Sequence, residues 1–136
     1  MPQASIEDYG DAANLGFIAR FFKRAAPDPT LLPRGQEIYD KRCADCHGAQ
    51  GQGAPGAYPG LAGNRALTMA SPANLVRVVL SGGFPPATAG NPRPYGMPPF
   101  GHELNDADVA SVVTFIRSAW GNDAGPVSPR EVFDLR

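Results

Sequence analysis

The stretch RCADCHGAQGQG, residues 42–53, contains both cysteines of this 136-residue chain and one of its two histidines. Cys43 and Cys46 are three positions apart, and His47 follows directly. On one helical turn this spacing brings two thiols and an imidazole together. The three side chains are therefore arranged to hold a single group.

The pattern Cys-x-x-Cys-His is an attachment sequence for c-type haem. Each thiol can form a thioether with one edge of the same porphyrin, and His47 then lies over the ring with its imidazole directed at the iron. Three alternatives explain less. A thioredoxin-like redox pair would follow a strand, zinc would need a fourth ligand where only His102 is left, and a plain disulfide would give His47 no role.

Iron bound by one histidine has an open axial position, and Met97 in YGMPPFG is the predicted ligand for it. A thioether bonds iron weakly and raises the reduction potential. Residues 82–101 contain six prolines, which lower the conformational entropy that the loop must lose to place the sulfur. His102 is the rival ligand, and Met69 is expected to fill the core.

Charge and composition exclude several classes of function. Twelve Lys and Arg against thirteen Asp and Glu give a net charge of −1 with no run of like charge, so nucleic acid is not an expected partner. No apolar run approaches the length of a membrane span, and the first residues lack the layout of a signal peptide. The length suits one compact domain.

Apolar spacing and capping residues predict an all-α chain of short helices joined by long Gly- and Pro-rich loops. Helices are expected at about 34–43, 71–83 and 105–121, with one more turn at the Ser-x-x-Glu capping pattern of 128–131. The predicted buried faces are Ile38 and Tyr39; Leu75, Val76, Val79 and Leu80; and Val109, Val112, Val113, Ile116 and Trp120.

The N-terminal flank, residues 1–33, is predicted to carry an extra helix followed by a linker at 27–33, and residues 34–136 to form the main domain. Residues 14–23 repeat the apolar pattern of residues 108–117 at a constant offset of 94. The flank is therefore either the end of a preceding, similar domain or simply another amphipathic helix.

Residues 34–120 resemble a class I c-type cytochrome in the order of their features: helix, Cys-x-x-Cys-His, PGLAG, a methionine loop and a last helix. The resemblance implies one covalent haem, with His47 and Met97 as iron ligands. It also implies that the Pro59 carbonyl accepts a hydrogen bond from the ligand histidine and that Leu61 packs on the haem. Gly35, Tyr39, Phe115 and Ile116 match the crossing of the first and last helices.

A closer similarity covers residues 38–136. The run GMPPFGHELNDADVASVVTFIRSAWGN, followed by V-S-x-x-E-V, resembles the C-terminal haem domain of cytochrome c subunits of bacterial membrane-associated dehydrogenases for alcohols, sugars, aldehydes or N-heterocycles. Those subunits carry three Cys-x-x-Cys-His sites, whereas this chain carries one.

These resemblances imply an electron-transfer protein in the periplasm, not an enzyme. Its donor would be a dehydrogenase or a preceding haem domain, and its acceptor a quinone, an oxidase or another cytochrome. The alternative is a haem-based sensor or a peroxidase-like enzyme with an open or displaceable sixth position. Arg65, Arg93 and Tyr95 are candidate partners of the haem propionates, with plain surface exposure as the favoured interpretation.

Overall fold

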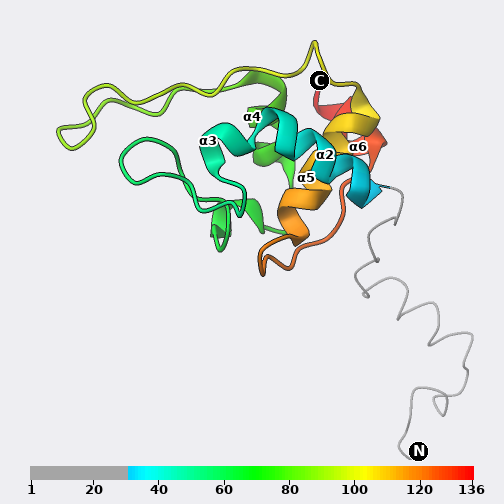
Figure 1. Ribbon diagram of the computed structural model, residues 1–136. Helices are drawn as coiled ribbons and strands as arrows, with labels where there is room; N and C mark the ends of the chain where they lie inside the picture. Colours follow the sequence, from blue (N-terminus) through cyan, green and yellow to red (C-terminus); the bar gives the residue numbers. More distant parts are fainter. Residues whose placement is uncertain (1–30) are drawn as a thin grey trace, which may run out of the picture.

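A computed structural model describes residues 31–136 (Figure 1). The elements in chain order are α2 (Leu31–Arg42), α3 (Ala44–His47), η2 (Arg65–Leu67), α4 (Ala73–Ser81), α5 (Asp106–Ser118) and α6 (Pro129–Leu135). Within this part of the chain there is no strand, only two isolated bridges. The predicted all-α class is confirmed, and the helix expected at residues 14–23 lies outside the described residues.

Helix α2 begins three residues before the expected start at Arg34, so the last part of the predicted linker is helical. Pro33 lies in the first turn of α2, where its missing N–H removes no intrahelical bond. At the other end, α2 stops at Arg42, and the short α3 then carries the chain from Ala44 to His47.

Helix α4 begins one residue later than its sequence suggested. Pro72 is the N-cap rather than the first helical residue, and the Ser71 hydroxyl accepts a hydrogen bond from the Ala73 N–H. Gly82 closes the helix as predicted, with its N–H donating to the Val78 carbonyl. The four residues predicted for its apolar face are all buried.

Helices α5 and α6 have the predicted caps. Asn105 accepts from the Asp108 N–H at the start of α5, and Ser128 and Glu131 form a capping box at the start of α6. The prediction was wrong for Trp120: α5 ends at Ser118, and Trp120 has a φ of 54° beyond it. Its ring still reaches the core, where it packs against Tyr39 at a centroid distance of 4.9 Å.

The core centres on the crossing of α2 and α5. Gly35 permits this approach, since a Cβ placed there would lie 2.2 Å from the Ser111 carbonyl oxygen and 2.8 Å from the Phe115 Cβ. Tyr39 is fully buried at the same crossing and contacts the Phe115 ring. The helix contact implied by the family resemblance is therefore present.

Two long loops, residues 48–60 and 83–97, leave the helical body on the same side (Figure 1). Their aromatic rings meet, because Tyr58 stacks on Tyr95 with centroids 5.1 Å apart. Among the described helices, none has the length and apolar character needed to cross a bilayer.

Candidate functional site

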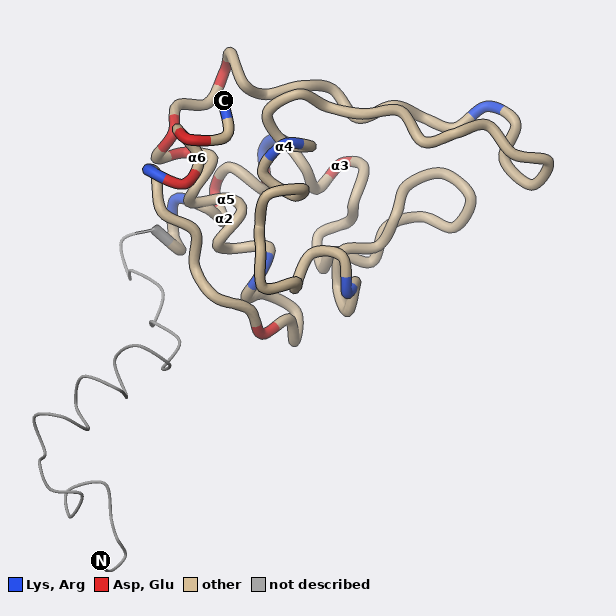
Figure 2. Tube along the Cα trace, turned by 180° about the vertical axis from the view of Figure 1, so that it is seen from behind, with Lys and Arg blue, Asp and Glu red and all other residues tan. Residues whose placement is uncertain are grey.

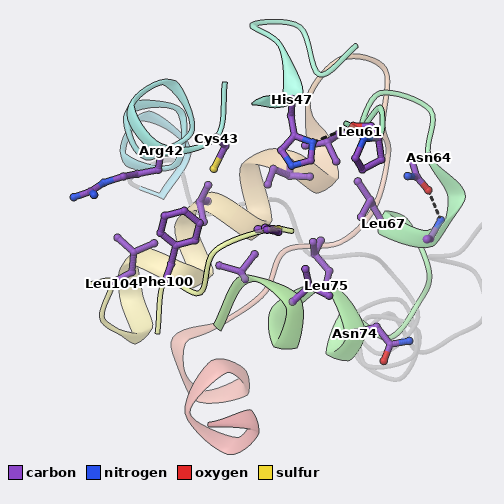
Figure 3. A pocket seen from close by; sticks show the side chains of 17 residues that line it. Arg42, Cys43, His47, Leu61, Asn64, Leu67, Asn74, Leu75, Phe100 and Leu104 are labelled. Carbon is purple, nitrogen blue, oxygen red and sulfur yellow. Dashed lines mark hydrogen bonds between the residues drawn. The ribbon is translucent and has the colours of Figure 1, made fainter. Parts of the chain in front are cut away.

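A cavity of about 210 Å³ lies between the Cys-x-x-Cys-His segment and α4, and it adjoins a second cavity of about 360 Å³ under the two loops. Figure 3 shows His47 and Leu61 on one side of the first cavity and Leu75 of α4 on the opposite side. The walls are almost entirely apolar: Leu61, Leu67, Leu75, Val78, Val79, Phe100, Leu104, Val112 and Ile116. Leu61, which the resemblance places against the haem, lines this cavity.

Both thiols border this space. Cys43 lines the two cavities and Cys46 the second one, and both are free cysteines. Burial raises the pKa of the Cys43 thiol to about 11. A thiol that stays protonated at neutral pH is a poor metal ligand and a poor redox nucleophile. In residues 31–136, moreover, no group of three or more His, Cys, Asp or Glu side chains could hold a metal ion.

The His47 ring is fixed by the backbone of the following loop. Its Nδ1 lies 3.0 Å from the Pro59 carbonyl oxygen. A carbonyl can only accept, so Nδ1 carries the proton and donates it to Pro59. In the neutral imidazole this tautomer leaves Nε2 free to accept, on a ring that lines both cavities. This is the tautomer that a metal-binding imidazole needs.

Met97 lines both cavities too, and its backbone is held in place. The Met97 N–H donates to the Gly83 carbonyl at 2.8 Å, and the Gly83 N–H donates back to Met97 at 3.1 Å. Three residues later the chain is tied to α4 itself, where the Phe100 N–H donates to the Val79 carbonyl. The methionine segment is therefore held at Met97 by the residue that follows the C-cap of α4, and at Phe100 by α4 itself.

The other candidates lie away from the cavity or on the surface. Met69 is 52% exposed, so the prediction that it fills the core was wrong. The Met69 backbone carbonyl, and not its side chain, contributes to the fold, because it accepts a hydrogen bond from Arg117. Three of the other candidates are exposed and line neither cavity: His102, Arg65 and Arg93. Tyr95 lines the second cavity, although 59% of its surface is exposed.

Sequence reasoning missed two buried polar residues that hold the loops around the cavity. Arg117 of α5 is 3% exposed and donates to the carbonyls of Leu67, Met69 and Gly125. Asn122 is 7% exposed, donates to the carbonyls of Leu61 and Ile116, and accepts from the Gly63 N–H. The only local sign of these buried hydrogen bonds in the sequence was a polar residue at the end of an apolar stripe. Such a residue usually indicates a helix end exposed to solvent.

The donor set and the walls fit a haem. Two thiols at one border, a correctly protonated imidazole on one face and a thioether in the lining surround a space that is otherwise apolar. Together the two cavities fall within the range of about 300–1,000 Å³ that is usual for cofactor sites. A comparison with protein families agrees with a haem site, since the sequence model of the cytochrome c family matches residues 32–120. The chain belongs to the cytochrome c family.

Curated relatives carry the same domain. The chain is 41% identical over 103 residues to the cytochrome c subunit of a quinone alcohol dehydrogenase from Gluconobacter oxydans, covering 75% of this chain and 22% of the relative. It is 39% identical over 104 residues to the gluconate 2-dehydrogenase cytochrome c subunit of Pantoea cypripedii, covering 75% and 24%. Cytochrome c-552 of Thermus thermophilus is 35% identical over 91 residues, covering 65% and 69%.

The chain thus spans less than a quarter of the length of these two dehydrogenase subunits. Family membership implies a covalently bound haem c, for which Cys43 and Cys46 supply the thiol pair. When bound, the haem iron takes up and releases one electron. As a member of this family, the domain is accordingly an electron-transfer domain.

Proposed function

We propose that His47 and Met97 are the two axial ligands of the haem iron and that both stay bound while the protein carries single electrons. The observation that supports this most is the 3.0 Å contact between His47 Nδ1 and the Pro59 carbonyl, which leaves Nε2 for the metal. Pro59 then acts as the positioning residue for His47, and the anchored Met97 segment offers the sulfur for the other face. Leu61 contributes apolar wall.

Carbon monoxide binding tests the ligand assignment. Wild-type ferrous protein should bind the gas slowly at neutral pH, because Met97 must first leave the iron. Met97→Ala should bind it readily and should have a lower reduction potential, since a thioether favours Fe(II). Met69→Ala is the matched control, because Met69 is an exposed methionine outside both cavities. Rapid binding by the wild-type protein would favour the sensor or peroxidase-like alternative.

We further propose that the electron donor is a dehydrogenase or a preceding haem domain, and that the acceptor is a quinone, an oxidase or another cytochrome. The similarity to alcohol and gluconate dehydrogenase cytochrome subunits supports the donor. Stopped-flow mixing tests it: the ferric protein should be reduced by a substrate-reduced quinone alcohol dehydrogenase whose own cytochrome subunit has been removed. No reduction above the rate with substrate alone would refute the donor class.

The proposed location is the periplasm, where thioether attachment takes place in c-type cytochromes. Expression with an added export signal should yield red protein, whereas expression in the cytoplasm alone should yield colourless protein. A red product from cytoplasmic expression would contradict this placement.

A further inference from the structure

The loops at residues 48–60 and 83–97 bring very little charge to the side of the molecule on which the second cavity lies. They contain no Asp, Glu or Lys, and Arg93 is their one charged residue. Figure 2 shows these loops in tan except for one basic position, with most charged positions over the helices. Charged residues make up 18% of the whole chain, so their near absence from both loops together is a property of this face.

Three aromatic rings stand on the same face. Tyr58 stacks on Tyr95 across the two loops, and Phe84 packs so closely over Gly96 that a Cβ there would lie 2.2 Å from its ring. Phe84 is 84% exposed and Tyr95 59% exposed. All three rings line the second cavity together with Cys46 and Met97. We call Tyr58, Phe84 and Tyr95 the aromatic rim.

Support of Met97 alone does not account for the aromatic rim. The Met97 backbone is already held by its two hydrogen bonds with Gly83. Most of the surface of Phe84 and Tyr95 faces solvent, so these rings contribute little area to the interior. Clustered exposed aromatic side chains of this kind are typical of surfaces that bind a partner.

We propose that the aromatic rim is the docking surface for another redox protein domain, and that the matching surface of this partner is also uncharged and apolar. Apart from Arg93, the two loops offer a charged partner surface no group with which to form an ion pair, so such a surface would lose its hydration here with little compensation. The aromatic rim borders the cofactor cavity, where a docked domain can exchange an electron and a lipid surface cannot. This inference rests on the proposed electron-carrier function.

Electron self-exchange is the test, because a second copy of the holoprotein presents just such an uncharged surface. In a mixture of reduced and oxidised protein, one electron passes from the ferrous copy to the ferric copy; the first is oxidised, the second is reduced, and no bond or proton changes. The rate constant comes from exchange broadening of NMR signals. For the wild-type protein this rate constant should depend only weakly on salt concentration, because the docking surface carries little charge.

Phe84→Glu places like charges in contact when two such copies dock. At about 0.01 M ionic strength, where screening extends over about 30 Å, self-exchange should slow by about tenfold or more, and it should recover in part at about 0.5 M. Phe133→Glu is the matched control. Phe133 is a phenylalanine of α6 that is 59% exposed and lines neither cavity, so its rate should stay within about twofold of wild type.

Three results would overturn the proposal: an unchanged rate in Phe84→Glu, an equal loss in both variants, or Phe84-dependent binding of the wild-type protein to neutral phosphatidylcholine vesicles. The last would assign the aromatic rim to a lipid surface. Carbon monoxide binding, measured on the same samples, reports separately on the axial ligands. A failure of the electron-carrier function is thereby distinguished from a failure of the docking surface.

Discussion

Replacing Gly82 with alanine should loosen the segment that carries Met97. Gly82 has φ 70° and ψ −170°, a region of backbone conformation that is essentially restricted to glycine. An added Cβ would also lie 2.4 Å from the Met97 carbonyl oxygen and 2.9 Å from the Pro99 nitrogen. Neither contact is to a flexible side chain, so the backbone of the methionine loop has to move.

The backbone conformation alone should cost about 1–3 kcal/mol. Relief of the overlap breaks one or both hydrogen bonds between Gly83 and Met97, each contributing about 0.5–1.5 kcal/mol. The free energy of unfolding should therefore fall by about 1.5–6 kcal/mol in total. Guanidinium denaturation of the ferric holoprotein measures this loss. Absorbance in the far red, where sulfur-ligated ferric haem has a weak band, reports whether the methionine has left the iron.

Gly83→Ala is the control for this experiment. A Cβ at Gly83 meets nothing within 4 Å, and its φ is outside the left-handed region, so its stability should change by less than about 1 kcal/mol. If Gly82→Ala matched Gly83→Ala in stability and kept the sulfur band, the steric account of the methionine loop would be refuted.

Three further substitutions probe the rest of the fold. Gly35→Ala drives a Cβ into the Ser111 carbonyl and should lower the stability by about 1–3 kcal/mol or more in urea denaturation. Asn122→Ala deprives the buried carbonyls of Leu61 and Ile116, and the Gly63 N–H, of their partner and should lower it by about 2–4 kcal/mol in the same assay. Burial raises the pKa of Tyr39 to about 12 from its ordinary value near 10. The unfolded chain therefore loses this proton first, and stability should fall between about pH 10 and 12; denaturation at several pH values should show a shallower slope for Tyr39→Phe.

The local pattern of the sequence was enough to predict the attachment site and the helices. Cys43, Cys46 and His47 are consecutive in the motif, so their proximity follows from the chain itself. Caps such as Asn105 act within three residues, and their hydrogen bonds formed as predicted. Met97 was predicted as an iron ligand from its proline-rich setting; that it lines both cavities, and that Gly83 holds its backbone, became visible only in the structure.

Contacts between distant parts of the chain could not be predicted in this way. Arg117 bonds to carbonyls 48 and 50 positions away, and Asn122 to one 61 positions away. In the local sequence, neither residue can be told apart from a solvent-exposed polar residue at the end of a helix. The same limit explains Met69: its side chain is apolar, yet its segment is used through a backbone carbonyl that Arg117 holds.

The buried amide of Asn122 connects the end of α5 to the histidine that we propose as iron ligand. It holds the Leu61 carbonyl and the Gly63 N–H, and Leu61 is only two residues from Pro59, whose carbonyl orients His47. Hydrogen bonds to a ligand histidine tune its basicity and hence the metal. If His47 binds the iron as proposed, we expect the reduction potential to depend on the packing at the end of α5 through these backbone atoms. Substitutions at the α5 end should consequently alter the potential as well as the stability, whereas substitutions on the exposed face of α6 should alter neither.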